Sequence, residues 1–306
     1  MLLHYSFNSL GTCLGVGTSD GVFECYNCNL GDSPDSKWRG PLISRKVPAG
    51  IRIIELLFHS SSIFLVGSSP QQSTTTNMSQ WSDCKLRIWS DSQRYVVGEL
   101  KFTTPIQTVR VNSSLIVVAL EDAVWIYRLN DLVSLESFRT SNNKVGAIAL
   151  TPNQDTQQSC VLACIGDHPG ALKIMYISPS DYGTSKTQSI TVHKHPIEYI
   201  AISECGQFVA TAGQLGTIIR LIKIDESHPP TVLWEYRRGY RKGSITSLVF
   251  SHNTSFLAAA SSRGTIHLFD IRNAVSSASL MVHADEKLSL RLRGLFVSIP
   301  LMIQSL

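Results

Sequence analysis

The sequence predicts an all-β chain with the architecture of a β-propeller. Three observations lead to this fold class. A unit of alternating and apolar segments separated by polar turns recurs six times. The copies follow one another at about the 40–45 residues of a propeller blade. Helical spacing of apolar residues over three turns is absent from the sequence, so strands are the expected elements throughout.

The first three copies cover residues 5–27, 54–90 and 106–129. Each starts with an alternating segment, such as IQTVRV, and continues after a polar turn with an apolar run rich in small residues, such as CLGVG. A turn with Gly or Asp then leads to a further alternating segment. This pattern is typical of three consecutive antiparallel strands, and a more polar fourth strand is expected after each copy.

The last three copies cover residues 145–177, 197–224 and 245–271 and repeat the same order of segments. Polar insertions, such as 68–83 and 225–230, predict surface loops. All six copies therefore predict the same kind of sheet, decorated by loops of different length.

Length and composition favour one large packed domain. The 306 residues suffice for an all-β domain with a sizeable core. We expect a single propeller domain over 1–306, with recognisable blades at about 5–271 and a loop and a degenerate or truncated last blade at 272–306. The charged fraction is 16% and the net charge is +4, a mildly basic balance that does not favour nucleic-acid binding.

Cysteine usage and the chain ends bear on the compartment. Seven scattered cysteines, an odd number, predict a reduced cytosolic chain. The start MLLHYSFNSLG has neither the basic nor the apolar region of a signal peptide. The apolar stretch LFVSIPLMIQSL (295–306) is too short to span a bilayer and contains Pro300. If the protein meets a membrane, it therefore does so from the side.

Motifs of common enzyme classes are absent from the sequence. It has no G-x-S-x-G elbow, P-loop, H-E-x-x-H or paired-carboxylate motif, so we expect neither an enzyme nor a cofactor. Cys25-x-x-Cys28 and the pair His193 and His195 have ligand-like spacing, but neither has the further ligands that a zinc site needs. The sequence therefore predicts no metal site.

The densest group of cations lies in the stretch WEYRRGYRKG, between two predicted strands. It contains Arg237, Arg238, Arg241 and Lys242. Neighbouring side chains of an extended segment project to opposite sides, so the two adjacent arginines are expected to serve different ligands. The alternative is a solvated rim cluster that only helps solubility.

A series of motifs around this cluster resembles the PROPPIN family, the seven-bladed WD40-like propellers that bind phosphoinositides and include the autophagy WIPI proteins. The resemblance covers roughly residues 5 to 271 and implies a WD40-like propeller. The motifs that carry it, in chain order, are His193 with Pro196, Ala210-Thr211-Ala212 with Gly216-Thr217-Ile218-Ile219-Arg220, Tyr236-Arg237-Arg238-Gly239, and Ser261-Ser262-Arg263-Gly264-Thr265-Ile266-His267-Leu268-Phe269.

Carried over by position, the resemblance implies two lipid head-group sites, one for each arginine of the R-R-G motif. The first would use His193, Thr217, Arg220 and Arg237, with Lys194 as a supplementary cation. The second would use Arg238, Arg241, Lys242, Ser261, Ser262, Thr265 and His267. The serine that the family has after Ala212 is Gly213 here, so the first pocket lacks a hydroxyl. His267 has the alternative role of a histidine inside the blade that bonds the backbone.

The resemblance also implies a membrane-inserting loop and a seventh blade. The corresponding loop is 272–294, in which Leu280, Met281 and Val282 are candidates for insertion or, alternatively, for a fourth strand. The family continues into a complete seventh blade, whereas residues 295–306 have neither the length nor the alternation for one. A truncated product, an alternatively spliced form and a divergent seventh blade all remain open.

The expected function is that of a non-enzymatic peripheral membrane effector. The resemblance implies binding to phosphatidylinositol 3-phosphate and its 3,5-bisphosphate on autophagosome-precursor, endosomal or vacuolar and lysosomal membranes. It also implies recruitment of autophagy or endosomal proteins as partners, with no nucleic acid. The alternative is a generic WD40 scaffold that holds protein partners and does not bind lipid.

Overall fold

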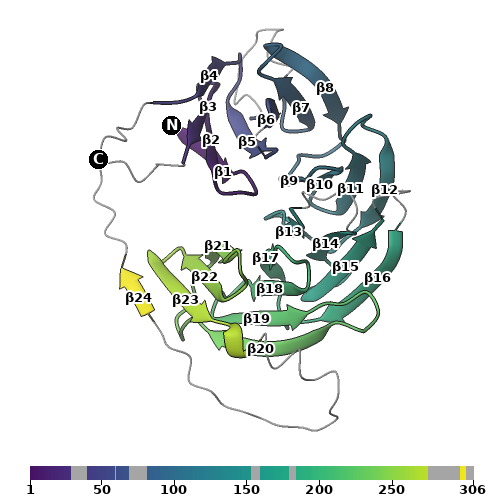
Figure 1. The fold of residues 1–306 in the computed structure, drawn as a ribbon, viewed down its shortest axis with the longest axis vertical. Coiled ribbons are helices and arrows are strands. Elements are labelled where there is room, and N and C mark those ends of the chain that lie inside the picture. Colours follow the sequence, from purple (N-terminus) through teal and green to yellow (C-terminus); the bar gives the residue numbers. More distant parts are fainter. Residues whose placement is uncertain are drawn as a thin grey trace. The chain divides into compact units, whose positions relative to one another are not determined.

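The computed structural model describes residues 1–28, 40–58, 60–68, 81–152, 159–178, 184–274 and 297–300. In these ranges the chain forms six antiparallel sheets of four strands each, and the strands of every sheet follow one another in chain order (Figure 1). The predicted all-β propeller architecture is confirmed, and each predicted copy supplies the first three strands of one sheet.

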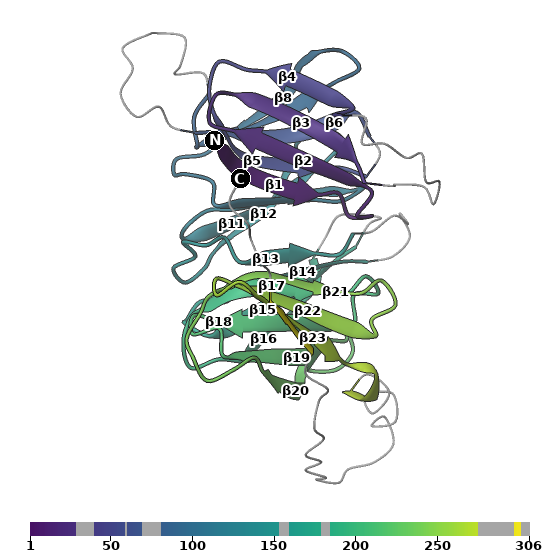
Figure 2. The same cartoon turned by 90° about the vertical axis from the view of Figure 1, so that its left-hand side faces the viewer.

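The chain forms two compact units, Met1–Phe138 and Arg139–Leu306. The first unit holds three sheets, apart from the last residue of β12, Arg139. Their strands are β1 (Leu2–Phe7), β2 (Cys13–Thr18), β3 (Val22–Asn27), β4 (Ile43–Lys46), β5 (Ile51–Leu56), β6 (Ser62–Gly67), β7 (Lys85–Ser90), β8 (Tyr95–Lys101), β9 (Thr108–Val111), β10 (Leu115–Ala119), β11 (Ala123–Arg128) and β12 (Ser134–Arg139). Figure 2 shows β1 to β4 side by side in that order.

The second unit holds the other three sheets. Their strands are β13 (Ile148–Leu150), β14 (Cys160–Ile165), β15 (Ala171–Ile177), β16 (Thr184–Thr191), β17 (Ile197–Ile202), β18 (Phe208–Gly213), β19 (Ile218–Lys223), β20 (Thr231–Arg237), β21 (Ile245–Phe250), β22 (Phe256–Ser261), β23 (Thr265–Asp270) and β24 (Val297–Pro300).

The cores lie between neighbouring sheets inside each unit. The first strands of successive sheets contact one another, β1 with β5 and β5 with β9 in the first unit, and β13 with β17 and β17 with β21 in the second. The second strand β2 also contacts β5, and a small residue allows this approach. A Cβ atom on Gly17 of β2 would lie 2.7 Å from Cγ2 of Ile51, so only glycine fits there without a shift of β5.

The segment 272–306 contributes to the sixth sheet. Val297–Pro300 pairs antiparallel with β23, from Leu268 opposite Val297 to Thr265 opposite Pro300. A degenerate last blade was expected within 272–306. The described part of this segment, Val297–Pro300, is instead the fourth strand of the sixth blade. The described residues contain six blades, and the seventh rests on the resemblance. Leu280, Met281 and Val282 lie outside the described residues.

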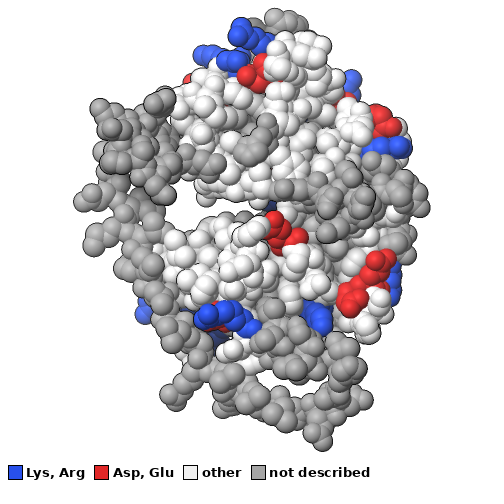
Figure 3. Space-filling view, in the orientation of Figure 1, with Lys and Arg blue, Asp and Glu red and all other residues white. Residues whose placement is uncertain are grey.

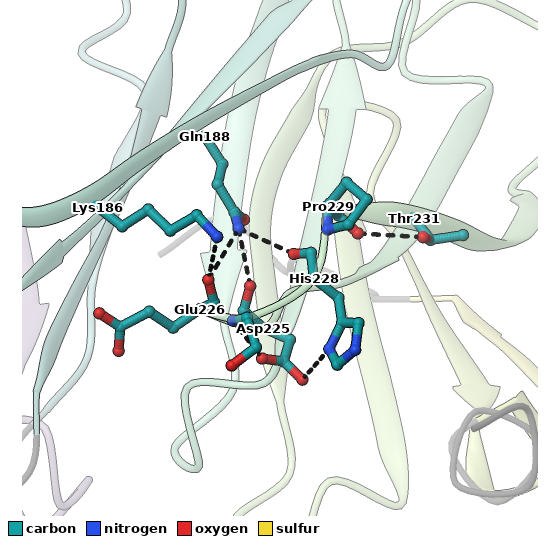
Figure 4. Close-up of polar contacts among 8 residues, drawn as sticks. Lys186, Gln188, Asp225, Glu226, His228, Pro229 and Thr231 are labelled. Carbon is teal, nitrogen blue, oxygen red and sulfur yellow. Dashed lines mark hydrogen bonds and ion pairs between the residues drawn. The ribbon is translucent and has the colours of Figure 1, made fainter.

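Figure 4 shows how the turn after β19 is fastened to the neighbouring sheet. The amide nitrogen Nε2 of Gln188, a buried residue of β16, donates to the carbonyl oxygens of Asp225 and His228 at 2.9 and 2.8 Å and more weakly to that of Glu226. Lys186 Nζ also donates to the Glu226 carbonyl. The predicted surface loop at 225–230 is therefore tied to the fourth sheet by backbone acceptors.

In the described ranges, no helix is long and apolar enough to cross a membrane.

Candidate functional site

A pocket of about 330 Å³ opens beside the turn between β18 and β19 in the second unit. Four of the five residues predicted for the first site line it: His193, Lys194, Thr217 and Arg220. The turn itself supplies the rest of the wall, including Gln214 and Gly216. The sequence motif G-T-I-I-R therefore begins in the wall of a cavity, where its backbone and its hydroxyl face the same space as two cations.

The turn is held by a close approach of two backbones. Gly216 has a φ of +58°, and a Cβ atom placed on it would lie 2.0 Å from the carbonyl oxygen of Gly243. Only glycine tolerates both the left-handed backbone and this contact. The Gly243 amide in turn donates to the Leu215 carbonyl at 3.2 Å. The loop between β20 and β21 is thereby packed against the pocket wall.

His193 belongs to the wall through a network of side chains. His193 is 8% exposed, its Nε2 lies 2.9 Å from Thr211 Oγ1, and its Nδ1 lies 3.3 Å from Arg220 Nη1. Because a guanidinium only donates, Nδ1 accepts, and the ring proton is on Nε2. Burial, and next the charge of Arg220, lower the pKa of His193 to about 4. The ring is neutral near pH 7 and orients Arg220.

Arg220 is shared between the pocket and its own sheet. Nε and Nη2 donate to Glu235 Oε2 at 3.1 and 2.8 Å, and Nη1 also donates to the Val192 carbonyl. Arg220 and Glu235 are directly opposite in the register of β19 and β20, so the ion pair follows from strand pairing. The fork of the guanidinium is therefore held in place, and its charge is partly neutralised, before any ligand binds.

Arg237 and Arg238 point to different surroundings. Arg237 lies opposite Ile218 in the register and so on the face of the sheet that carries Glu235, two residues away. It is exposed, and its guanidinium carbon lies 5.5 Å from the centre of the Tyr240 ring. Arg237 is outside the pocket wall, although its opposite residue Ile218 is part of it.

Arg238 turns inward and is 7% exposed. Nε donates to the Gly216 carbonyl at 2.5 Å, Nη2 to the Arg241 carbonyl at 2.7 Å, and Nη1 to Ser261 Oγ at 3.4 Å. Burial, and next the charge of Arg263, lower the pKa of Arg238. In the part of the chain that the structure describes, its hydrogen-bond partners are carbonyls and a hydroxyl, with no carboxylate among them. Among the described residues, this buried positive charge is thus hydrogen-bonded to neutral groups.

A chain of hydroxyls leads from Arg238 to the last predicted residue of the second site. Ser261 Oγ lies 3.0 Å from Thr265 Oγ1, which lies 3.2 Å from His267 Nε2. Burial, and next the charge of Arg238, lower the pKa of His267. With His267 neutral, Arg238 donates to Ser261, Ser261 donates to Thr265, and Thr265 donates to His267. All three hydrogen bonds then run in the same direction, from the guanidinium to the imidazole. His267 also stacks on Phe269, and its described hydrogen bond is to the Thr265 side chain.

The remaining residues predicted for the second site lie on the surface around Arg238. Arg241, Lys242 and Ser262 are exposed, and the amide of Ser262 donates to the Ser244 carbonyl. Arg263, to which the motifs assigned no role, donates from Nε to the Lys242 carbonyl at 3.0 Å. Figure 3 shows a different group of Lys and Arg atoms, which lies by the short coil that follows β23 in Figure 1.

Several residues of the site could not be assigned from motifs. His195, Gln214 and Leu215 line the pocket, but none stands at a motif position. Arg263 lies inside the motif S-S-R-G-T without a predicted role. The feature of the sequence that could have indicated it is a cation in the turn directly before Gly264. Gly213, where the resemblance implies serine, packs closely on the pocket wall: a Cβ atom there would lie 3.3 Å from His193 Nδ1, tighter than most side-chain contacts.

Metal binding has no support in the described ranges, where no three His, Cys, Asp or Glu side chains come together as a possible ion site. The CxxC cysteines Cys25 and Cys28 are free thiols, the first buried and the second half-buried.

Comparisons with known proteins agree with the motifs. A family model described as PROPPIN matches residues 2–281. Autophagy-related protein 18 of Yarrowia lipolytica is 29% identical over 287 residues, which are 89% of this chain and 67% of that protein. SVP1-like protein 2 of Pichia angusta is 30% identical over 274 residues, which cover 89% and 71% of the two chains.

Solved structures show the same fold. Kluyveromyces lactis Hsv2 superposes with a TM-score of 0.70 at 20% identity and covers 96% of this chain and 79% of its own. In a complex of KlAtg21 with the coiled coil of AgAtg16, a chain superposes with a TM-score of 0.67 at 24% identity, over 88% of this chain and 81% of its own.

Proposed function

Because the chain belongs to the PROPPIN family of autophagy-related, phosphoinositide-binding propellers, we propose that it is a peripheral membrane effector that binds 3-phosphorylated phosphoinositides. The head groups of phosphatidylinositol 3-phosphate and phosphatidylinositol 3,5-bisphosphate occupy two sites on the second unit. One is the pocket beside the turn from β18 to β19, and the other is the surface around Arg238.

The observation that carries the proposal is the buried charge of Arg238. Burying a cation is costly unless an opposite charge or hydrogen bonds compensate it. Its described partners are two backbone carbonyls and Ser261, which satisfy donors but do not neutralise the charge. A phosphate bound at this surface supplies the missing negative charge, and Ser261 and Thr265 supply hydroxyls beside it.

The first pocket suits a phosphorylated inositol for a related reason. Lys194 and Arg220 give it two cations, and Thr217 a hydroxyl, in a cavity of about 330 Å³. Glu235 already neutralises part of the charge of Arg220. The pocket therefore favours a head group that it shares with the exposed Arg237 at its edge.

Two modest sites on one surface make membrane binding cooperative. Once one head group is bound, a second in the same bilayer is captured intramolecularly, which raises avidity by roughly 10²–10⁴. Cations near an anionic leaflet add about 1 kcal/mol each. We therefore expect weak binding to single soluble head groups and much tighter binding to vesicles that contain the lipid.

On the membrane the protein acts as a recruitment scaffold without enzymatic activity. The structure of KlAtg21 with the coiled coil of AgAtg16 supports a protein partner of this kind. We expect autophagosome-precursor, endosomal or lysosomal and vacuolar membranes as its location, and autophagy or endosomal proteins as its partners.

Flotation with liposomes tests the proposal. Vesicles of phosphatidylcholine and phosphatidylserine are compared with and without phosphatidylinositol 3-phosphate, for the wild type and for Arg237→Thr with Arg238→Thr. The wild type is expected to float only with the phosphoinositide, and the double variant to lose that flotation, because both sites lose their arginine.

Removal of Lys46 and Lys101, two exposed cations of the first unit, by Lys46→Thr with Lys101→Thr is the matched control. It changes net charge by the same amount and should float like the wild type. If the arginine double variant binds the phosphoinositide as well as the wild type does, the assigned site is wrong and the lipid-independent WD40 scaffold is favoured.

A further inference from the structure

The loop between β20 and β21 presents an exposed aromatic side chain between the two candidate sites. Tyr240 is 89% exposed, the highest value among the exposed large apolar and aromatic side chains of the described ranges. Its described ring contact is with Arg237, whose guanidinium carbon lies 5.5 Å from the ring centre. A tyrosine ring left in water in this way forgoes the burial that usually stabilises it.

The backbone that carries Tyr240 is fixed from both sides. On the side of the first pocket, the Gly243 amide donates to the Leu215 carbonyl. On the side of the second site, Arg263 Nε donates to the Lys242 carbonyl, and Arg238 Nη2 to the Arg241 carbonyl. These hydrogen bonds hold the backbone of the loop, and the side chains of residues 240–242 are exposed.

Cations surround the ring. Arg241 and Lys242 follow it directly and are exposed, and Arg237 stacks on it. In the described part of the chain, the side chains of Arg241 and Lys242 have no carboxylate partner. A single projecting ring with three cations beside it matches the boundary of an anionic bilayer, where aromatic rings lie at the level of the head groups and cations contact the phosphates.

We propose that Tyr240 is an interfacial membrane anchor, which inserts its ring among the lipid head groups while the two neighbouring sites hold phosphoinositides. This inference rests on the proposed function and adds a third point of contact, made by a residue that is not among those predicted for either site, although its ring contacts Arg237. It is separate from the segment with Leu280, Met281 and Val282.

A bilayer fits this surface better than a protein partner does. Protein interfaces are built around a cluster of apolar side chains that become fully buried, with charged residues at the rim. Here one exposed ring lies on the loop, and its neighbours in sequence are glycine and cations. Tyrosine also suits the interface chemically, because its apolar body can enter while its hydroxyl stays among polar groups.

The depth of the ring is measured with Tyr240→Trp and lipids brominated in their acyl chains. The chain has five native tryptophans, so the signal is the quenching added relative to the wild type. We expect added quenching on vesicles of phosphatidylcholine, phosphatidylserine and phosphatidylinositol 3-phosphate. Tyr95→Trp, at a 55% exposed tyrosine of β8, is the matched control and should add none.

Affinity gives the second readout. Tyr240→Ala should weaken binding to the same vesicles about five- to tenfold, the effect of withdrawing part of an aromatic ring from water, while Tyr95→Ala should not. The affinity of Tyr240→Ala for the soluble head group inositol 1,3-bisphosphate should fall by a smaller factor, because both head-group sites remain.

The outcomes separate the two claims. If the wild type fails to distinguish vesicles with phosphatidylinositol 3-phosphate from vesicles without it, the proposed function fails and the anchor with it. If the wild type does distinguish them but Tyr240→Trp adds no quenching, or Tyr240→Ala binds vesicles as tightly as the wild type, the anchor is overturned and the two sites stand.

Discussion

Arg237 and Arg238 are adjacent in the sequence and differ in almost every physical respect. Arg237 is exposed and stacks on Tyr240, whereas Arg238 is buried and donates to the carbonyls of Gly216 and Arg241. Strand geometry accounts for the divergence, since neighbouring side chains project to opposite faces. Arginine is required at the inward position because lysine lacks the planar fork that reaches three acceptors at once.

The buried His193 makes a pH-dependent contribution to stability. Its pKa is about 4 in the folded state and about 6.5 when exposed, so the unfolded chain binds the proton more readily between these values. The contribution is therefore present above pH 6.5 and is lost as the pH falls toward 4. At about 1.4 kcal/mol per pKa unit, the loss over these 2.5 units is at most about 3.5 kcal/mol.

Urea unfolding of the wild type and His193→Gln, at pH 7.5 and at pH 4.5, checks this. At pH 7.5 the wild type should have a higher free energy of unfolding than His193→Gln, and this difference should be smaller at pH 4.5. Burial also lowers the pKa of His4 to about 4, so its contribution to stability changes with pH in the same direction as that of His193. Burial raises the pKa of Glu55 to about 7, so its contribution changes in the opposite direction. The test therefore compares the stability difference between wild type and variant at each pH. His195→Gln, at an exposed histidine, is the control. A gap that stays constant with pH would contradict the buried neutral ring.

The sequence indicated which candidate residues lie near one another better than it indicated their contacts. The R-R-G motif and strand alternation were enough to expect two directions for the arginines. His193 was expected as a ligand, yet both of its nitrogens are engaged by Thr211 and Arg220. These partners come from β18 and β19, and only the register of the sheet brings them to His193. The role of Glu235 depended on the same register.

At the scale of elements, the turn from β18 to β19 and the turn from β22 to β23 both contact the loop from β20 to β21. Together they support both sites. Gly216 lies where the turn from β18 to β19 meets the loop from β20 to β21. In Gly216→Ala the new Cβ would collide with the Gly243 carbonyl, at a backbone conformation that costs a non-glycine residue on the order of 1–3 kcal/mol. We expect lower stability and weaker binding to phosphoinositide vesicles, because both sites are displaced.

Thermal unfolding and flotation of Gly216→Ala, side by side with Gly239→Ala, measure this effect. A Cβ atom on Gly239 would have no heavy atom within 4 Å, so this control should behave like the wild type in both assays. Equal behaviour of the two variants would show that the contact between Gly216 and Gly243 does not support the sites.

The tie from β16 to the turn at 225–228 predicts a change in stability without a change in binding (Figure 4). Gln188→Ala leaves the carbonyls of Asp225 and His228 without their buried donor, which costs about 1–3 kcal/mol. Chemical denaturation should show that loss, while flotation stays at the level of the wild type. Thr187→Ala, at the exposed neighbour, serves as the control. Loss of flotation in Gln188→Ala would mean that the tie extends its influence to the sites.

At the scale of the whole molecule, the repeat pattern was sufficient to predict the fold. Alternation and turn residues are local properties, and they placed three strands in each of six sheets. The fourth strands were harder. β24 is supplied by Val297–Pro300, well beyond the sixth copy, because a strand that joins a sheet from a distance is selected by pairing with β23 and leaves little local signal. The seventh blade stays an expectation from the family.

Two separate sites are the central claim, and the stoichiometry of head-group binding tests it most directly. Isothermal titration with inositol 1,3-bisphosphate should give two sites in the wild type and one in each of Arg237→Thr and Arg238→Thr. A single site in the wild type, or single variants that each lose all binding, would contradict the assignment of one arginine to each site.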